Sequence, residues 1–248
     1  MAQDTDPRVV AAGWLPERPG KRPPRDIPDA IVEPDWGGLR VAAALARDDA
    51  SIFSRGEVVS APEDLLRALL DAFRADEAVI TGHLTVEAFR TGQGVVPSPP
   101  PVERPPILVP KAFRRSVRDD PFVLGRDRER VRDAGEAVVL AAVEEGVRHA
   151  FVATDLLLLD GEPLDDIPLL ERKRLLETVI EPSDLVRLSP WVKPSAKVVL
   201  VSWGTLGFGT LSWRSVNSRH LAGRENPDWA MGRAPASPMP GPKPTAPR

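Results

Sequence analysis

The most restrictive feature of the sequence is the segment from Phe151 to Val179, whose pattern predicts a strand, a tight turn, a second strand and a helix. A nearly continuous apolar run from Phe151 precedes Asp160-Gly161, a dipeptide typical of β-hairpin turns. Leucines at helical spacing follow over 168–179, and Leu175, Leu176 and Val179 are expected to pack on the sheet. A hairpin covered by a helix predicts an α+β domain.

The prolines indicate how the chain is divided. There are 28 of them, clustered at 16–28, 97–110 and 235–247, where they remove amide donors and disfavour packed structure. We therefore expect an extended proline-rich leader over 1–29 and a disordered proline-rich tail over 234–248. The folded domain would span 30–233, interrupted by a proline- and arginine-rich surface excursion over 97–126.

Several further elements are expected within the domain. Short alternating runs after Ala30 predict an antiparallel meander, and two strand pieces are expected about Gly82 within 78–86. Ser60-Ala-Pro-Glu63 resembles a capping box, which predicts a helix over 61–74. An amphipathic helix is expected over 127–147. Val198–Trp203 is interpreted as a strand with 207–213 as its hairpin partner.

Composition excludes several classes of protein. The chain has no cysteine and three histidines, so disulfides and thiolate sites are excluded and we expect no metal site. No signal peptide or membrane span is visible, so a cytoplasmic protein without membrane contact is expected. The net charge of −3 gives no general attraction to nucleic acid. The segment from Arg104 to Arg132 contains nine basic and four acidic residues. It is interpreted either as a solvated surface or as a weak DNA contact.

A strand, Trp-Gly-Gly turn and second strand over 31–40 contain a motif that bears on chemistry. Its sequence, Glu33-Pro34-Asp35-Trp36-Gly37-Gly38-Leu39-Arg40, resembles the motif Glu-Pro-Lys-Trp-Asp-Gly-x-Arg of ATP-dependent DNA ligases and related nucleotidyltransferases. In that family the lysine is the nucleophile that takes AMP from ATP. Here Asp35 replaces the lysine and Gly37 replaces the aspartate.

The Phe151–Leu176 segment resembles a second ligase pattern in the correct order along the chain. That pattern reads Phe-x-x-Phe-Asp-Leu-Leu-x-x-Asp-Gly-x-x-Leu and then Pro-Leu-x-Glu-Arg-Arg. The resemblance covers about 30–233. It implies an ATP-grasp-like nucleotidyltransferase domain of mainly antiparallel sheets flanked by helices, without the oligonucleotide-binding barrel of a complete ligase.

The resemblance also locates further site positions, most of them altered. Arg40 and Arg55, the latter in Ser54-Arg55-Gly56, match arginines that contact the nucleotide in active members, and here they would be vestigial. Thr81 and His83 replace the acids of Asp-Gly-Glu, and Phe208 and Trp213 replace a glutamate and a lysine. Met231-Gly232-Arg233 stands where the family has its closing Lys-x-Lys.

These replacements favour a catalytically degenerate ligase-like domain that serves as a binding or scaffold module. An anionic Asp35 would repel a triphosphate, and the lost lysines and carboxylates would remove charge stabilisation and metal placement. We then expect neither ATP nor Mg²⁺ as cofactor, and an unidentified protein or DNA as partner, with DNA repair as the process implied by the resemblance. Four aromatic residues would fill the former nucleotide cleft: Trp36, Phe208, Trp213 and Trp229.

Two alternatives remain open at this point. The chain would be a functional ATP-dependent DNA ligase, using ATP and Mg²⁺, if another amine replaced the missing lysine. It would be a different enzyme if the changed pocket had acquired new acid/base or anion-binding chemistry. The residues available for that chemistry are Asp35, His83, Glu33, Arg40, Arg55 and Arg233.

Overall fold

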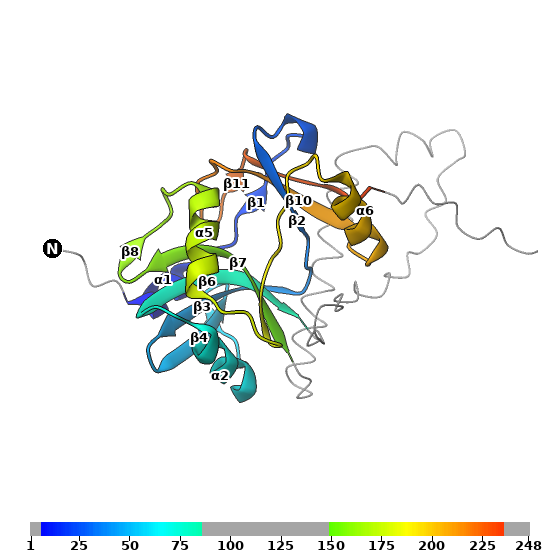
Figure 1. Cartoon of the computed structure of the whole chain (residues 1–248). Coiled ribbons are helices and arrows are strands. Elements are labelled where there is room, and N and C mark those ends of the chain that lie inside the picture. The colour runs from blue at the N-terminus through cyan, green and yellow to red at the C-terminus, as the bar shows by residue number, and fades with distance from the viewer. Residues whose placement is uncertain (1–5, 86–148, 236–248) are drawn as a thin grey trace, which may run out of the picture.

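The computed structural model describes residues 6–85 and 149–235, which form two larger sheets, a two-stranded one, and helices that pack on them (Figure 1). The large sheet has the strand order β5 (Glu57–Val58), β4 (Asp49–Ser54), β3 (Leu39–Ala46), β6 (Glu77–Thr85), β7 (Ala150–Leu159) and β8 (Glu162–Pro163). These neighbours are all antiparallel, and β9 (Val186–Leu188) adds a parallel pairing to β7. The Asp160-Gly161 hairpin is confirmed, and so is the antiparallel pairing of β3 with β4 in the predicted meander. The first strand of that meander, at residues 31–32, instead belongs to the other sheet.

The small sheet has the order β12 (Trp229–Arg233), β10 (Thr210–Ser215) and β2 (Ala30–Pro34), all antiparallel. β2 belongs to this sheet and β3 to the large one, so residues 35–38 carry the chain from one sheet to the other. A third, two-stranded parallel sheet pairs β1 (Arg18–Pro19) with β11 (Glu225–Asn226), and β1 also contacts β12 of the small sheet.

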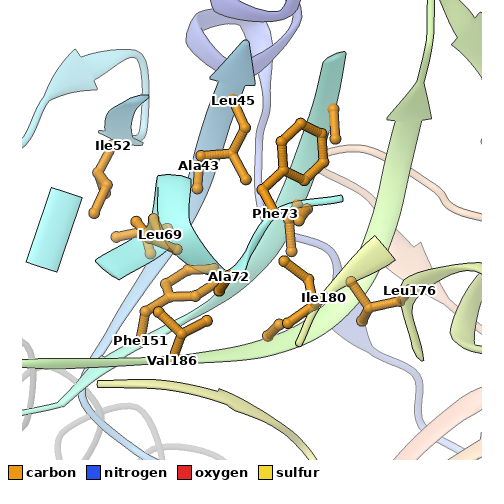
Figure 2. Close-up of a cluster of buried hydrophobic side chains, with 14 of the residues drawn as sticks. Ala43, Leu45, Ile52, Leu69, Ala72, Phe73, Phe151, Leu176, Ile180 and Val186 are labelled. Atoms are coloured by element: carbon orange, nitrogen blue, oxygen red, sulfur yellow. The ribbon is translucent and has the colours of Figure 1, made fainter. Parts of the chain in front are cut away.

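The main core lies between one face of the large sheet and the helices α2 (Glu63–Ala72) and α5 (Leu169–Val179). Because side chains alternate along a strand, Leu39, Val41, Ala43 and Leu45 of β3 all point to this face. Figure 2 shows Leu69 of α2 near Ala43 of β3, and Leu176 of α5 near Ile180, within this core. Leu176 and Val179 are buried as predicted, whereas Leu175 is only partly buried.

The opposite face of the large sheet is covered by α1 (Pro7–Gly13), which corrects the expected extended leader. The Asp6 carboxylate accepts a hydrogen bond from the Arg8 amide, and Pro7 occupies the first helical position, where a missing amide donor costs nothing. Ala11 and the following Trp14 are buried against Ala42 and Ala44 of β3. Farther along, the short 3₁₀ helix η1 (Pro24–Asp26) contacts β12.

The segment interpreted as a strand at 198–203 is instead part of the helix α6 (Lys197–Thr205), so its predicted hairpin with 207–213 is wrong. β10 pairs with β2 and β12. Helical spacing puts Leu200 and Trp203 on one buried face, and this tertiary contact outweighs the strand preference of the valines. The hydrophobicity of the segment had indicated burial correctly but not its geometry.

Two smaller predictions also need correction. α2 begins after Pro62 without a side-chain cap, so the capping box at Ser60 does not form, although the helix itself is present. β6 is one continuous strand and not two pieces, with a register irregularity between Thr81 and Gly82. Gly82 is needed there because a Cβ would lie 2.2 Å from the Val152 carbonyl oxygen.

Other predictions fall on residues that the structure does not describe. The excursion at 97–126, the basic segment from Arg104 to Arg132, the helix at 127–147 and the tail from residue 236 onwards all lie outside the described ranges. None of the helices formed within 6–85 and 149–235 has the length and apolar content to cross a membrane.

Candidate functional site at the junction of the sheets

The crossover of residues 35–38 brings the altered ligase-like motif to the junction of the two sheets. Gly37 and Gly38 have positive φ values of 61° and 71°, a conformation that glycine adopts without strain. The Asp35 amide donates to the Thr210 carbonyl oxygen at 3.1 Å, and the Trp36 indole donates to Ser189 Oγ at 2.9 Å. The loop is therefore fastened to both β10 and the segment after β9.

His83 is brought to the same loop by β6. Its Nδ1 donates to the Gly37 carbonyl oxygen at 2.6 Å, since a carbonyl can only accept. Burial, with Arg40 directly opposite on β3, lowers the pKa of His83 to about 4. A neutral imidazole that already donates to the backbone acts here as a structural support for the loop.

The aromatic replacement at Phe208 lies in an apolar cluster beside the loop. Phe208 packs edge-to-face on Trp36, with ring centroids 5.1 Å apart and an interplanar angle of 78°. The buried members of the cluster are Val32, Leu200, Trp203, Phe208 and Leu211, and its partly buried members are Trp36, Val192, Trp213 and Ala234. Three of the four aromatic residues expected to fill the former nucleotide cleft, Trp36, Phe208 and Trp213, thus lie in one cluster, and Trp229 is not a member of it. That this cluster occupies a nucleotide cleft stays a prediction.

Trp229 has a different environment from the other three aromatic residues. Its indole donates to Ser212 Oγ at 2.7 Å, and the guanidinium carbons of Arg40 and Arg214 lie 5.3 and 5.4 Å from its ring centroid. This geometry is that of cation–π contacts. Arg40 also donates to the Glu17 main-chain oxygen at 2.7 Å, so its guanidinium is held by the leader segment.

The remaining predicted site residues are spread over three elements. Thr81 is buried on β6, and Arg55 is exposed in the turn between β4 and β5 with a φ of 51°. On β12, Met231 is partly buried opposite Ser212, and Arg233 is exposed opposite Thr210. The geometry therefore groups Asp35, Gly37, His83, Arg40 and Phe208 around the crossover, and it leaves Arg55 on an exposed turn.

A buried ionic network that the sequence reasoning missed lies at the base of this junction. Arg172 of α5 makes two 2.8 Å bonds to the Asp155 carboxylate of β7, and Arg214 of β10 lies 3.3 Å from that carboxylate. Burial alone would raise the pKa of Asp155, but Arg172, Arg214 and Lys173 outweigh it and hold that pKa well below its ordinary value. Asp155 is therefore a permanent anion paired with arginines.

Lys173 and Glu33 form a second buried pair beside the first. The Lys173 ammonium donates to Glu33 Oε1 at 2.5 Å and to the Thr154 carbonyl oxygen at 2.7 Å, with both side chains at most 5% exposed. Two adjacent residues of α5 thus bind different strands: Arg172 binds β7, and Lys173 binds β2. Since β7 and β2 belong to different sheets, α5 joins the two sheets by charge.

The third carboxylate of the network is Glu17, from the leader. It accepts from Arg214 at 2.9 Å, from the Leu221 amide at 2.6 Å and from the Asn226 side chain at 2.8 Å. Burial would lower the pKa of Arg214, but Glu17, Asp155 and Glu33 together raise it. Arg172 and Lys173 lie within the second ligase-like pattern and were within reach of sequence reasoning, whereas Glu17 stood in a proline-rich segment that gave no such signal.

The chemistry open to this arrangement follows from these pairings. Each buried carboxylate already accepts from at least one arginine or lysine, and no group of three potential metal ligands occurs among residues 6–85 and 149–235. The Lys173 amine is held between an acid and a carbonyl. The junction is thus a charge-balanced structural centre beside an apolar cluster.

Known proteins resemble this chain in both sequence and fold. A DNA ligase of Pyrobaculum calidifontis is 26% identical over 164 residues, which make up 65% of this chain and 23% of that protein. Two solved structures, the ligase domain of M. tuberculosis LigD and a mycobacterial DNA ligase D complexed with ATP and MES, each superpose with a TM-score of 0.56 at 18% identity, covering 90% of this chain and 60% of theirs. No protein-family model matches the sequence. The chain thus spans less than a quarter of the length of the curated relative, and its likeness to solved structures establishes the fold.

Proposed function

Because the chain has the nucleotidyltransferase fold of DNA ligases, we propose that it is a ligase-like domain without covalent nucleotidyl transfer, used as a cytoplasmic binding or scaffold module. The observation that carries this proposal is the position of Asp35. The resemblance assigns it the place of the nucleophilic amine, and it lies on a loop fastened between the two sheets. A carboxylate there cannot form the phosphoramide bond that nucleotidyl transfer by a lysine requires, and it repels phosphate.

The surroundings of Asp35 support the same proposal. Phe208, which stands at a position where the family has a charged residue, is only 7% exposed and packs on Trp36. Lys173, a buried amine of the same junction, already donates to Glu33 and Thr154. To bind a triphosphate, a site needs cations that are not already paired with acids. These contacts instead form an apolar surface and ion pairs whose charges cancel. We therefore propose that neither ATP nor Mg²⁺ is a cofactor.

The direct test is incubation of the full chain with Mg²⁺ and ATP that is radiolabelled at the α-phosphate, followed by denaturation in detergent at mildly alkaline pH, where a P–N bond is stable, and gel analysis. We expect no labelled protein, in parallel with an active ATP-dependent DNA ligase that gives a strong labelled band. A labelled band from this chain, mapped to any lysine, would show that the domain still transfers AMP.

The partner class is a separate part of the proposal. A role in DNA repair is proposed on the likeness to DNA ligases alone, and a DNA contact through Arg104–Arg132 would involve residues that the structure does not describe. A mobility-shift titration with a short duplex at rising salt separates the two classes. If the domain binds DNA, the duplex should shift and the binding affinity should fall steeply as the salt concentration rises. If the domain is a protein scaffold, no shift is expected.

A further inference from the structure

The segment between the buried residues Trp14 and Ile27 crosses from one sheet to the other on the surface, and we call residues 15–26 the strap. Before it, α1 packs on the large sheet, and at its end η1 contacts β12 of the small sheet. Of these twelve residues Glu17 alone is buried, at 3% exposure, while the others are partly or fully exposed. Glu17 is therefore the one buried side chain by which the strap is attached.

Glu17 fills a site built for a carboxylate group. One oxygen accepts from the Leu221 amide at 2.6 Å and the Asn226 side chain at 2.8 Å, and the other accepts from Arg214 at 2.9 Å. The last two donors are themselves buried, Asn226 at 1% and Arg214 at 7% exposure. His220 Nδ1 lies 3.6 Å from the second oxygen. Converging donors on both oxygens of a planar group are the geometry of carboxylate recognition.

The rest of the strap is attached through its main chain and through partly or fully exposed side chains. Its main-chain bonds include those from the Arg18 amide to Arg224, from the Gly20 amide to Trp229 and from the Gly223 amide to Leu15. Four of its residues are prolines, which lack an amide donor and fix the extended backbone in advance. Segments with few buried contacts open locally at lower free energy than the core.

We propose that the strap is a displaceable internal ligand, and that the site it fills binds an acidic side chain of a partner protein when the strap is released. Release would uncover Arg214 and Asn226, and it would free Arg40 from the Glu17 main-chain oxygen while leaving its contact with Trp229. The cations then face an external carboxylate with the donors already in place. This inference concerns the strap and stands whether or not the domain binds nucleotide.

The first test replaces the internal carboxylate. In the full chain, Glu17→Ala removes the carboxylate and leaves space that acetate can enter, whereas Glu17→Gln keeps the space filled. At equal ionic strength, saturating acetate in place of chloride should raise the unfolding midpoint of Glu17→Ala by about 3 °C, and it should leave the wild type and Glu17→Gln unchanged.

Each outcome of this comparison decides the carboxylate site. If Glu17→Ala folds only in acetate, the site is supported as strongly as by the shift in midpoint. If acetate and chloride act alike on this variant, or if it folds in neither, the site is overturned. Inorganic phosphate serves as a second probe, and a larger gain with phosphate than with acetate would overturn the assignment to carboxylates.

The second test measures release of the strap by amide hydrogen exchange on the wild-type chain. The Arg18 and Gly20 amides should exchange at least about 100-fold faster than the Val32 amide, which is bonded to Val192 beside the small sheet. Added acetate competes with Glu17 and should accelerate only the strap amides. Exchange of Arg18 and Gly20 at the rate of Val32 would show that the strap opens only with global unfolding and would overturn displaceability.

Discussion

At the scale of single residues, the contacts of Asp35 and its neighbours lead us to expect that one substitution would not create an active site. The crossover loop keeps its shape through the Asp35 amide and the Trp36 indole, and neither bond depends on the Asp35 carboxylate. These two bonds therefore remain available when the Asp35 side chain is changed. The apolar side chain of Phe208 would still stand near the crossover and offer no charge to a phosphate.

We therefore expect Asp35→Lys to fold as the wild type does and to give no labelled adduct with ATP and Mg²⁺. Asp35→Asn is the matched control, because it removes the carboxylate without adding an amine. Both variants should still unfold in one cooperative transition, which would show that they are folded. An adduct formed by Asp35→Lys alone would mean that the pocket is intact apart from its nucleophile.

The lowered pKa of His83 predicts that the free energy of unfolding depends on pH. Its folded pKa of about 4 lies below the ordinary value of 6.5 because burial and Arg40 disfavour the imidazolium. As the pH falls, the unfolded chain therefore takes up this proton before the folded protein does. The contribution of His83 to the free energy of unfolding is complete above pH 6.5, and it declines by at most about 3 kcal/mol as the pH falls toward 4. Urea unfolding at several pH values should show this decline in the wild type.

His83→Asn is the comparison for that experiment, because it keeps a donor for the Gly37 carbonyl and cannot be protonated. Carboxylates and His220 titrate in both proteins, so only the difference between the two curves reports His83. The difference should shrink between pH 6.5 and 4. A difference independent of pH would contradict the low pKa assigned to this side chain.

At the scale of elements, α5 is a helix whose buried face carries charge. Arg172 and Lys173 are buried at 0% and 3% exposure, and their partners lie in different sheets. Removing one member of such a buried pair leaves the other without compensation. The helix start is also fixed by main-chain bonds, from the Leu169 and Leu170 amides to the carbonyls of Ser218 and Val216.

Arg172→Met should accordingly lower the free energy of unfolding by about 3 to 5 kcal/mol. Arg174→Met is the matched control on the same helix, since the exposed Arg174–Glu171 pair should contribute less than about 1 kcal/mol. Urea midpoints of the two variants measure both effects. Equal losses would argue that the buried pair does not join α5 to the sheet.

A substitution at Gly82 tests how closely β6 pairs with β7. An added Cβ would lie 2.2 Å from the Val152 carbonyl oxygen, which is main chain and cannot turn aside. Gly82→Ala should therefore cost about 3 kcal/mol or more by overpacking. Gly209→Ala meets nothing within 4 Å and should stay within about 0.5 kcal/mol. A neutral Gly82→Ala would mean that the two strands are not held this closely.

These elements also show what local sequence can and cannot predict. The hairpin at Asp160-Gly161 and the helices α2 and α5 were predictable because turn chemistry and leucine spacing are local signals. α6 was not, since Val198–Trp203 satisfies both a strand and a buried helix until its packing is known. α1 had a readable start at Asp6-Pro7, which the surrounding prolines obscured.

At the scale of the whole molecule, buried charges of two elements link the sheets, in addition to the crossover loop of residues 35–38. α5 joins them through Arg172 and Lys173, and the strap joins them through Glu17. The fold class was predictable because two motifs occurred in the right order along the chain. The ionic network was not, because Glu17 and Asn226 are 209 positions apart and only the fold brings them together.

The central claim is that this fold persists without a working nucleotide site. Isothermal titration calorimetry of ATP with Mg²⁺ into the full chain tests that claim most directly. The account predicts only heats of dilution, with the protein shown to be folded by its unfolding transition. A saturable isotherm with micromolar affinity would contradict it.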